Sequence, residues 1–245
     1  MTMARPDVVY IVRKGDDNES LRYSLRSLKN IKHGKVFISG YKPNWVKNCT
    51  YLHVDQGPLK YKNGGLNIAK ACKSGAVSEN FLLMNDDFFI MRPITGDLPI
   101  LYMGGLNMAI DLFTKISPES PYVEGMKNTR EMLHTLGMQR LVCYETHTPL
   151  LINKRKWLEL RDLRFDYFPQ YDMIHMRTLY GNYYGIGGGQ IKSRLKRIND
   201  VKIVNDSTPF SRYWKFISTT HSTFVNGRAG QFIRKSLSHK CEYEV

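Results

Sequence analysis

The sequence predicts an α/β fold, in which a mostly parallel sheet is flanked by helices and joined to a smaller, irregular part. Short β-branched runs alternate with segments of helical periodicity in the first 95 residues, an order typical of parallel sheets covered on both faces. The chain has 245 residues and is 42% hydrophobic, which suffices for a substantial core. Beyond Pro93 the alternation loosens, although no sharp change in composition marks a domain boundary.

The elements of the first part follow from local patterns. Asp7–Val12 is a β-branched run and predicts a central strand. A helix is expected to begin near Asp17 or Asn18, either of which can cap it. Its apolar residues keep helical spacing up to His33-Gly34: Leu21, Leu25, Leu28 and Ile31. Further strands are expected at 35–39, 50–54 and 81–84. A second helix at 63–74 should turn four residues toward the sheet: Leu66, Ile68, Ala69 and Cys72.

The second part contains fewer regular patterns. Helices are expected at 129–135 and 154–163, and strands at 140–144, 201–204 and 216–220. The segment Tyr180–Gln190 is rich in Tyr and Gly, which predicts a loop near a site or a flexible connection. We therefore divide the chain into a first half, 1–95, and a second half, 96–245, that could also form a single compact unit.

The charge of the chain favours an anionic partner. It has 36 Lys and Arg against 22 Asp and Glu, a net charge of +14. Between Lys192 and Lys240 eleven basic residues face two acidic ones, a net +9. Such a field suits nucleic acid, acidic polysaccharide or an anionic membrane surface, whereas the alternative is a solvated basic face. The first cluster supplies the candidate acceptor-binding residues: Lys192, Arg194, Lys196 and Arg197.

The sequence also predicts a cytoplasmic protein. No apolar stretch approaches the roughly 20 residues that span a bilayer, and Met1–Asp7 has no apolar signal core. The spacing of the four cysteines fits no paired zinc pattern, and we expect free thiols. These residues are Cys49, Cys72, Cys143 and Cys241.

Two adjacent acids are the most informative motif. Asp86 and Asp87 follow the expected strand at 81–84 after a single residue, Asn85. Open α/β sheets bind ligands at the carboxyl ends of their strands. Burying two adjacent carboxylates is costly, and a divalent cation offsets that cost. Oxygen ligands suit Mg²⁺ or Mn²⁺, which usually also hold substrate phosphates. The alternative is an Asn-Asp turn with two solvated acids.

Basic residues follow the first strand and precede the second helix. Arg13 and Lys14 lie where a diphosphate would meet the sheet edge, or else form a solvated loop. Lys60, Lys62 and Asn63 come before Gly64-Gly65, where we expect the helix to start. Backbone amides at a helix start attract anions, although an ordinary loop–helix junction has the same sequence.

Three short blocks resemble a known family. Asp7-Val-Val-Tyr with Leu21-Arg-Tyr-Ser-Leu-Arg-Ser-Leu is similar to the first conserved region of the Stealth proteins, which are nucleotide-sugar-dependent transferases related to bacterial capsule hexose-phosphate transferases. Phe81-Leu-Leu-Met-Asn-Asp-Asp-Phe-Phe resembles their second region, and Glu145-Thr-His-Thr-Pro resembles their third. Their first region usually carries Trp-Val-Asp-Gly, whereas this chain has Ile11-Val-Arg-Lys-Gly, a departure that weighs against phosphate transfer.

The wider layout resembles the GT-A class of glycosyltransferases, whose sheet is Rossmann-like. The resemblance implies a nucleotide-sugar-binding first half and an acceptor-binding second half. It implies that Asp86 and Asp87 hold Mn²⁺ or Mg²⁺; a late histidine often completes such a site, and His221 is the candidate. The implied donor-binding residues are Arg13, Lys14, Lys60, Lys62, Asn63, Asn85 and Asp86. The candidate general bases are Glu145, His147 and Asp172.

The functional prediction is therefore a metal-dependent glycosyltransferase with a nucleotide-sugar donor, a UDP-sugar first of all. The acceptor hydroxyl would belong to a polyanion, such as the hydroxymethylated DNA of viruses that glycosylate their genomes. One alternative is a sugar-phosphate transferase acting on capsule or cell-surface polysaccharide. Alternatives from other classes are a non-catalytic nucleic-acid-binding protein and a metal-dependent nuclease.

Overall fold

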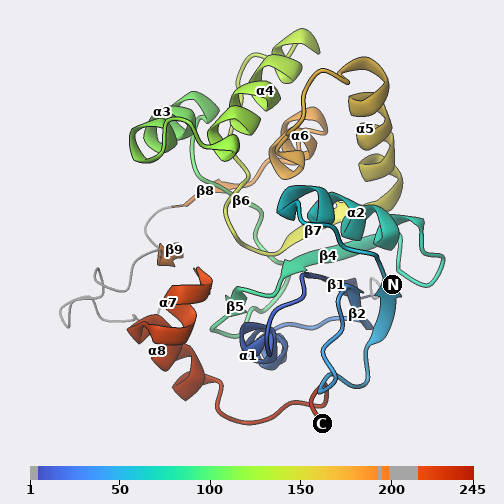
Figure 1. Cartoon of the computed structure of the whole chain (residues 1–245), viewed down its shortest axis with the longest axis vertical. Helices are drawn as coiled ribbons and strands as arrows, with labels where there is room; N and C mark the ends of the chain where they lie inside the picture. Colours follow the sequence, from blue (N-terminus) through green and yellow to red (C-terminus); the bar gives the residue numbers. More distant parts are fainter. Residues whose placement is uncertain (1–4, 192–194, 199–214) are drawn as a thin grey trace. The chain divides into compact units, whose positions relative to one another are not determined.

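The structure is a computed structural model that describes residues 5–191, 195–198 and 215–245, with 195–198 as backbone only (Figure 1). The chain forms two compact units. Unit 1 comprises Met1–Leu98, His147–Lys154 and Lys192–Val245, and unit 2 comprises Pro99–Thr146 and Arg155–Ile191. These units differ from the predicted halves, because the chain returns to unit 1 twice after leaving it. The functions assigned to the two halves stay predictions.

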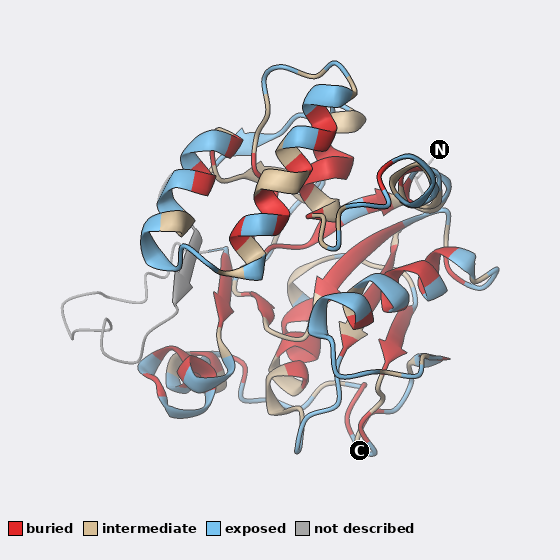
Figure 2. Ribbon diagram, turned by 45° about the horizontal axis from the view of Figure 1, so that its top comes forward, coloured by how far each residue is buried: buried red, intermediate tan, exposed pale blue. Residues whose placement is uncertain are grey.

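A five-stranded sheet forms the centre of unit 1, in the order β3-β2-β1-β4-β7. Strand β1 (Asp7–Val12) runs parallel to β2 (Val36–Gly40) and β4 (Asn80–Asn85), and β3 (Thr50–His53) is parallel to β2. Only the edge strand β7 (Leu150–Asn153) is antiparallel. Strands β1, β2 and β4 are almost completely buried (Figure 2), as expected for a parallel sheet. The predicted mostly parallel α/β fold is confirmed.

Two helices connect these strands. Helix α1 (Glu19–Ser27) continues into the 3-10 turn η1 (Leu28–Asn30), and its first amide, Glu19 N, donates to Asp17 Oδ1 at 2.8 Å. The helix thus begins close to the predicted start, with Asn18 at the N-cap position; Asn18 makes no side-chain cap bond, and Asp17, one residue earlier, binds the first helical amide instead. Helix α2 (Lys60–Lys73) begins earlier than predicted, so Gly64 and Gly65 lie inside it.

The predicted apolar face of α2 is correct for Ile68, Ala69 and Cys72 but wrong for Leu66, which is 40% exposed. Two asparagines, Asn63 and Asn67, are buried instead. The sequence prediction missed them because it assigned buried positions from hydrophobicity alone.

A second sheet in unit 1 has the order β5-β10-β9. Strand β10 (Phe216–Thr219) is antiparallel to β5 (Phe88–Ile90) and parallel to β9 (Leu195–Ile198). Helices α7 (His221–Asn226) and α8 (Arg228–Ser236) follow β10. They share a buried cluster with this sheet, formed by Phe89, Ile217, Phe224, Ile233 and Leu237. The strand predicted at 216–220 is confirmed, and the one predicted at 201–204 lies outside the described residues.

The end of the chain is fixed by a buried ion pair in unit 1. The carboxylate of Glu244 lies 2.6 Å from Arg26 Nε and 3.0 Å from Arg22 Nη1, and its side chain is fully buried. Burial by itself raises the pKa of Glu244. The hydrogen bonds from Arg26 and Arg22 outweigh this effect and lower the pKa to about 2. The carboxylate therefore stays ionised inside the protein.

Unit 2 is mostly helical. It contains α3 (Leu106–Ile116), α4 (Pro121–Thr135), most of α5 (Lys154–Tyr167) and α6 (Met176–Tyr183). The short strands β6 (Leu101–Tyr102) and β8 (Gly189–Gln190) pair in parallel. The predicted helices at 129–135 and 154–163 are confirmed, and both are longer than predicted.

Two predictions for unit 2 are wrong. The strand expected at 140–144 is reduced to a single bridge between Val142 and Gly105. The loop expected at 180–190 begins as the last turn of α6, where a Cβ on Gly181 would lie 2.3 Å from the ring of Tyr144. Gly181 therefore permits close packing rather than breaking the helix.

All four cysteines lie within the described residues and are free thiols, as predicted. Within the same residues, no helix combines the length and the apolar character that crossing a membrane requires.

Candidate functional site

The two acids lie where the main sheet passes into the second sheet of unit 1. Strand β4 ends at Asn85, Asp86 and Asp87 form a turn, and β5 begins at Phe88. Asn85 is in register with Ile11 near the end of β1, so the carboxyl ends of β1 and β4 share an edge. All three polar residues are half-buried. This edge is where ligands bind in sheets of this kind.

Electrostatics connects Asp86 with two predicted donor-binding residues. Burial raises the pKa of Asp86 to about 6, while a backbone hydrogen bond and the positive charges of Arg13 and Lys60 oppose the rise. Arg13 leaves the end of β1 and Lys60 opens α2, and both are exposed. The structure therefore brings an acid and two exposed bases to the same edge.

His147 also belongs to unit 1. Its ring centroid lies 5.7 Å from that of Phe88, the residue that follows the two acids, with the rings edge to face at 70°. The backbone of His147 has φ 51°, a left-handed conformation that is uncommon outside glycine and concentrates at functional sites. The predicted base is thus close to the turn that carries the acids.

Strand β10 lies beside the strand that follows the acidic turn, with Ser218 paired to Phe88. His221, the predicted metal ligand, begins helix α7 just after β10. The hydroxyls of Ser218 and Thr219 are buried and accept or donate no hydrogen bond within the described structure. The sequence analysis did not single out these two residues, because a short strand does not show which hydroxyl the fold buries without a partner.

The residues at this edge fit a divalent cation in part. Asp86 and Asp87 offer hard oxygen ligands, and the raised pKa of Asp86 shows that its ionised form lacks full compensation. Among the described residues, no three His, Cys, Asp or Glu side chains are grouped to hold a metal. Mg²⁺ is commonly held by one or two carboxylates together with substrate phosphates. An ion held by these two carboxylates would therefore need ligand oxygens to complete its coordination.

The other predicted donor-binding residues differ in their surroundings. Lys14 and Lys62 are exposed, and the backbone N–H of Lys14 donates to Gln56 Oε1 at 3.2 Å. Asn63 is buried. Its Nδ2 donates to the Gly57 carbonyl at 2.7 Å, and its Oδ1 accepts from the Gly57 N–H at 3.0 Å. The structure therefore gives Asn63 a role in fixing the loop before α2.

Three residues that the sequence analysis did not single out hold the end of β1. Gln56 Nε2 and Asn67 Nδ2 donate to the carbonyl of Val12, at 2.6 and 3.4 Å. Gly40 has φ 109°, and a Cβ there would lie 2.3 to 2.6 Å from Val12 O and both amides. This arrangement fixes the point from which Arg13 extends. In the sequence, the glycine at the end of the second strand, Gly40, was the feature that could have indicated this close approach.

In unit 2, Glu145 forms part of a helix cap. Its Oε1 accepts from the N–H and the hydroxyl of Thr178, both at 3.2 Å, in the first turn of α6. It also lies 3.7 Å from Nδ1 of His175, whose Nε2 is 2.9 Å from the Tyr122 carbonyl. Burial by itself lowers the pKa of His175, but the hydrogen bond and charge of Glu145 outweigh this and raise it.

The remaining candidates are Asp172 and the four residues of the first basic cluster. Asp172 is exposed in unit 2, where its charge acts on Arg164. Lys192 and Arg194 lie outside the described residues. Lys196 and Arg197 belong to β9, whose backbone pairs them with Ile217 and Ser218 of β10.

Comparison with known proteins adds the fold class. No protein-family model and no curated protein matches the sequence. The chain is similar to the solved structure of galactosyltransferase LgtC in complex with donor and acceptor sugar analogs, at a TM-score of 0.53 and 12% identity over 95% of both chains. It also aligns with glycosyltransferase GlyE of Streptococcus pneumoniae TIGR4, at a TM-score of 0.47 and 10% identity over 97% of this chain and 61% of that chain. The fold is that of the GT-A glycosyltransferases.

Proposed function

We propose that the chain is a nucleotide-sugar-dependent glycosyltransferase that moves a sugar to a hydroxyl of a polyanionic acceptor in the cytoplasm. The observation that carries the proposal is the meeting of Asp86, Arg13 and Lys60 at the carboxyl edge of a GT-A-type sheet. A fold alone does not define an activity. Carboxylates beside exposed cations, however, suit a metal-bound diphosphate.

Each residue at the edge has a task in this proposal. Asp86 and Asp87 would hold Mn²⁺ or Mg²⁺ together with the donor phosphates, and the bound ion would supply positive charge for the departing nucleoside diphosphate. His221, the further ligand predicted from the sequence, is not grouped with the two acids among the described residues. Arg13 grips the diphosphate through two parallel hydrogen bonds, and Lys60 acts as a point charge. Lys14 and Lys62 add to the positive field around the donor, for which a UDP-sugar is the first candidate. Asn85 contacts the sugar.

His147 is the general base of the proposal. Neutral imidazole accepts a proton near neutral pH, and His147 belongs to the same unit as the two acids. Glu145 is already occupied by the cap of α6, which favours His147 over it. As the acceptor hydroxyl attacks the sugar, its proton passes to the imidazole and the nucleoside diphosphate leaves.

The net charge of +14 supports a polyanionic acceptor. Hydroxymethylated DNA and acidic polysaccharide share this property, and salt separates them. An acceptor gripped through six or more DNA phosphates loses roughly 1000-fold in affinity between 50 and 200 mM salt. An acceptor oligosaccharide should show a much shallower dependence.

A thermal-shift panel tests the donor site. Nucleotide sugars with Mn²⁺ should raise the melting temperature. At a ligand concentration 100 times the Kd, the native state gains about 2.7 kcal/mol of free energy of unfolding. The Asp86→Asn variant should lose that shift. A panel in which no nucleotide sugar stabilises the wild-type protein would overturn the proposal.

Product analysis then separates the rival activities. Release of a nucleoside diphosphate indicates sugar transfer, whereas release of a nucleoside monophosphate indicates sugar-phosphate transfer. Fragmentation of DNA with metal and without donor indicates a nuclease. DNA binding that is unchanged in Asp86→Asn, together with no response to any nucleotide, indicates a non-catalytic nucleic-acid-binding protein.

A further inference from the structure

The loop that carries Arg13 is closed by a single side chain. We call residues 13–18, between β1 and α1, the donor loop. The Nδ2 of Asn18 donates to the Arg13 carbonyl at 2.8 Å, and its Oδ1 accepts from the Gly15 N–H at 3.2 Å. Asn18 has φ 52°, a conformation that Asn tolerates better than most residues. One amide thus joins both sides of the loop.

A second contact holds the donor loop from outside. The indole Nε1–H of Trp45 donates to the Asp17 carbonyl at 2.8 Å. The guanidinium of Arg22, on α1, lies 4.2 Å from the centroid of the Trp45 ring, within the range of a cation–π interaction. Trp45 therefore connects the loop with the helix that follows it.

The last three residues of the chain hold Trp45 in turn. The Val245 N–H donates to the Trp45 carbonyl at 2.9 Å, and the Lys47 N–H donates to the Tyr243 backbone carbonyl at 3.0 Å. Val46 and Glu244 form an antiparallel bridge between these contacts. The carboxylate of Glu244 also pairs with Arg22, the residue whose guanidinium lies over the Trp45 ring. The chain terminus and the donor loop are thereby connected through one tryptophan.

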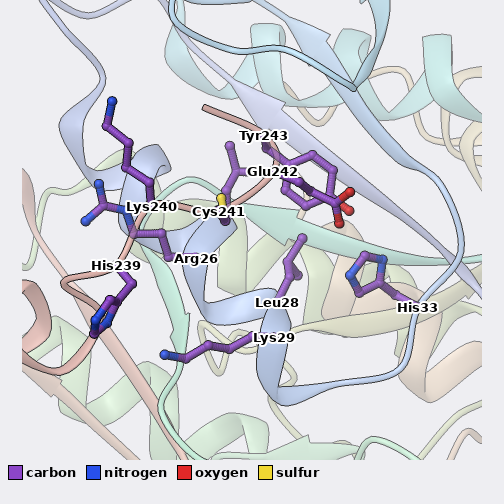
Figure 3. A pocket seen from close by; sticks show the side chains of 10 residues that line it. Arg26, Leu28, Lys29, His33, His239, Lys240, Cys241, Glu242 and Tyr243 are labelled. Carbon is purple, nitrogen blue, oxygen red and sulfur yellow. The ribbon is translucent and has the colours of Figure 1, made fainter. Parts of the chain in front are cut away.

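The rest of the C-terminal segment packs less closely. A pocket of about 250 Å³ lies between α1–η1 and residues 239–243 (Figure 3). Its lining includes Arg26, Leu28, His33, Cys241 and Tyr243. The contacts around Trp45 and Glu244 lie next to this space, and further bonds to the same segment come from Arg26, to the Leu237 and Ser238 carbonyls, and from Asn48, to the Glu242 carbonyl.

We propose that Trp45 is a positioning residue for the donor loop, and that residues 243–245 support donor binding through it. The proposal rests on the proposed function, since it takes Arg13 as a donor-binding residue. Fixing the backbone of a flexible loop residue costs conformational entropy. A loop that is already ordered before the donor arrives does not incur this cost on binding, so its affinity is higher.

The test compares Trp45→Phe with Tyr184→Phe. Trp45→Phe keeps a ring beside Arg22 but removes the hydrogen bond to Asp17. Tyr184→Phe removes a similar bond, from its hydroxyl to the Lys156 carbonyl at 2.9 Å, in unit 2. Amide exchange of residues 14–18 is measured without ligand, and donor KM and kcat are measured with Mn²⁺. Asn18→Gly, which keeps the backbone conformation and loses both amide bonds, calibrates a loop that has lost its internal closure and keeps its contact with Trp45.

Trp45→Phe should speed amide exchange in the donor loop. It should also raise the donor KM about three- to tenfold, which is the free energy of one hydrogen bond expressed as an affinity change. The kcat at saturating donor should not change. Tyr184→Phe should change neither. Unchanged loop exchange in Trp45→Phe, or equal acceleration throughout unit 1, would overturn the positioning role. Faster exchange with an unchanged KM would overturn its link to binding. If the wild-type protein binds no nucleotide, the proposed function fails, and the exchange measurement still decides whether Trp45 orders the loop.

Discussion

Asp86 in unit 1 and Glu145 in unit 2 were both predicted as site residues, and their surroundings in the structure differ. Glu145 accepts two hydrogen bonds from Thr178 and pairs with His175. Asp86 has its pKa raised to about 6 by burial, which the charges of Arg13 and Lys60 only partly offset. The acid of unit 2 caps a helix, whereas the ionised form of the acid of unit 1 is disfavoured by burial. The hydrogen bonds of Glu145 thus favour a structural role for that acid, while a ligand-binding role for Asp86 stays a prediction.

The largest expected effect comes from removing the acids of unit 1. Asp86→Asn or Asp87→Asn should lower Mn²⁺-dependent turnover of a nucleotide sugar by roughly 1000-fold, about 4 kcal/mol of activation free energy. The melting temperature of the ligand-free protein should stay level or rise for Asp86→Asn, because the ionised carboxyl is disfavoured by burial. Steady-state kinetics and thermal unfolding measure both. Asp172→Asn, at an exposed acid of unit 2, is the matched control and should keep most of the activity.

The next effect concerns an acid of unit 1 that is fully paired. Glu244→Gln should destabilise the protein by roughly 3 kcal/mol, because it leaves Arg22 and Arg26 without their buried partner. The pKa of Glu244 is lowered to about 2, so its contribution is complete above the unfolded pKa. It is lost as pH falls from about 4.5 toward 2. Urea unfolding at pH 7 and pH 3 should show the gap between wild type and variant shrinking at the lower pH.

A smaller effect is expected for the cap of unit 2. Glu145→Gln should cost roughly 1–2 kcal/mol of stability, since an amide oxygen caps α6 less well and leaves His175 without its anion. Turnover at saturating substrates should fall by no more than about threefold, the equivalent of a fraction of a kcal/mol. A loss as large as that of Asp86→Asn, with stability unchanged, would make Glu145 a catalytic residue and remove the contrast between the units.

The smallest effect separates the units by pH. The pKa of His175 is raised, so its pairing with Glu145 contributes fully below the unfolded value of about 6.5 and is lost as pH rises through the folded pKa. Amide exchange of α6 should accelerate modestly above that pH, by a free energy under about 1 kcal/mol. The amides of β1 should not respond over the same range. A parallel response in both units would show that the effect is not local to the cap.

Much of unit 1 could be predicted from the sequence. Strand β1 was predicted with its observed bounds, because β-branched residues in an unbroken run have few alternatives. The acidic turn followed from the same logic, since an apolar run that stops at two acids ends a strand. Leu66 was predicted to be buried but is exposed, because helical spacing alone does not show which positions the fold covers.

Unit 2 and the supporting residues were harder to predict. The cap formed by Glu145, Thr178 and His175 joins positions 30 or more residues apart in the chain, and no local pattern links them. Gly181 was taken as part of a loop, whereas it allows α6 to approach Tyr144. The buried amides of Asn63 and Asn67 depend on backbone partners that only the folded chain supplies.

The order in which the chain visits its two units has a practical outcome. Unit 1 is assembled from three stretches of sequence and unit 2 from two, so no single cut can isolate either one. A fragment ending near residue 98 would lack the edge strand β7, the histidine beside Phe88 and the terminus that seats Trp45. Dissection of this protein therefore calls for point substitutions or circular permutation rather than truncation.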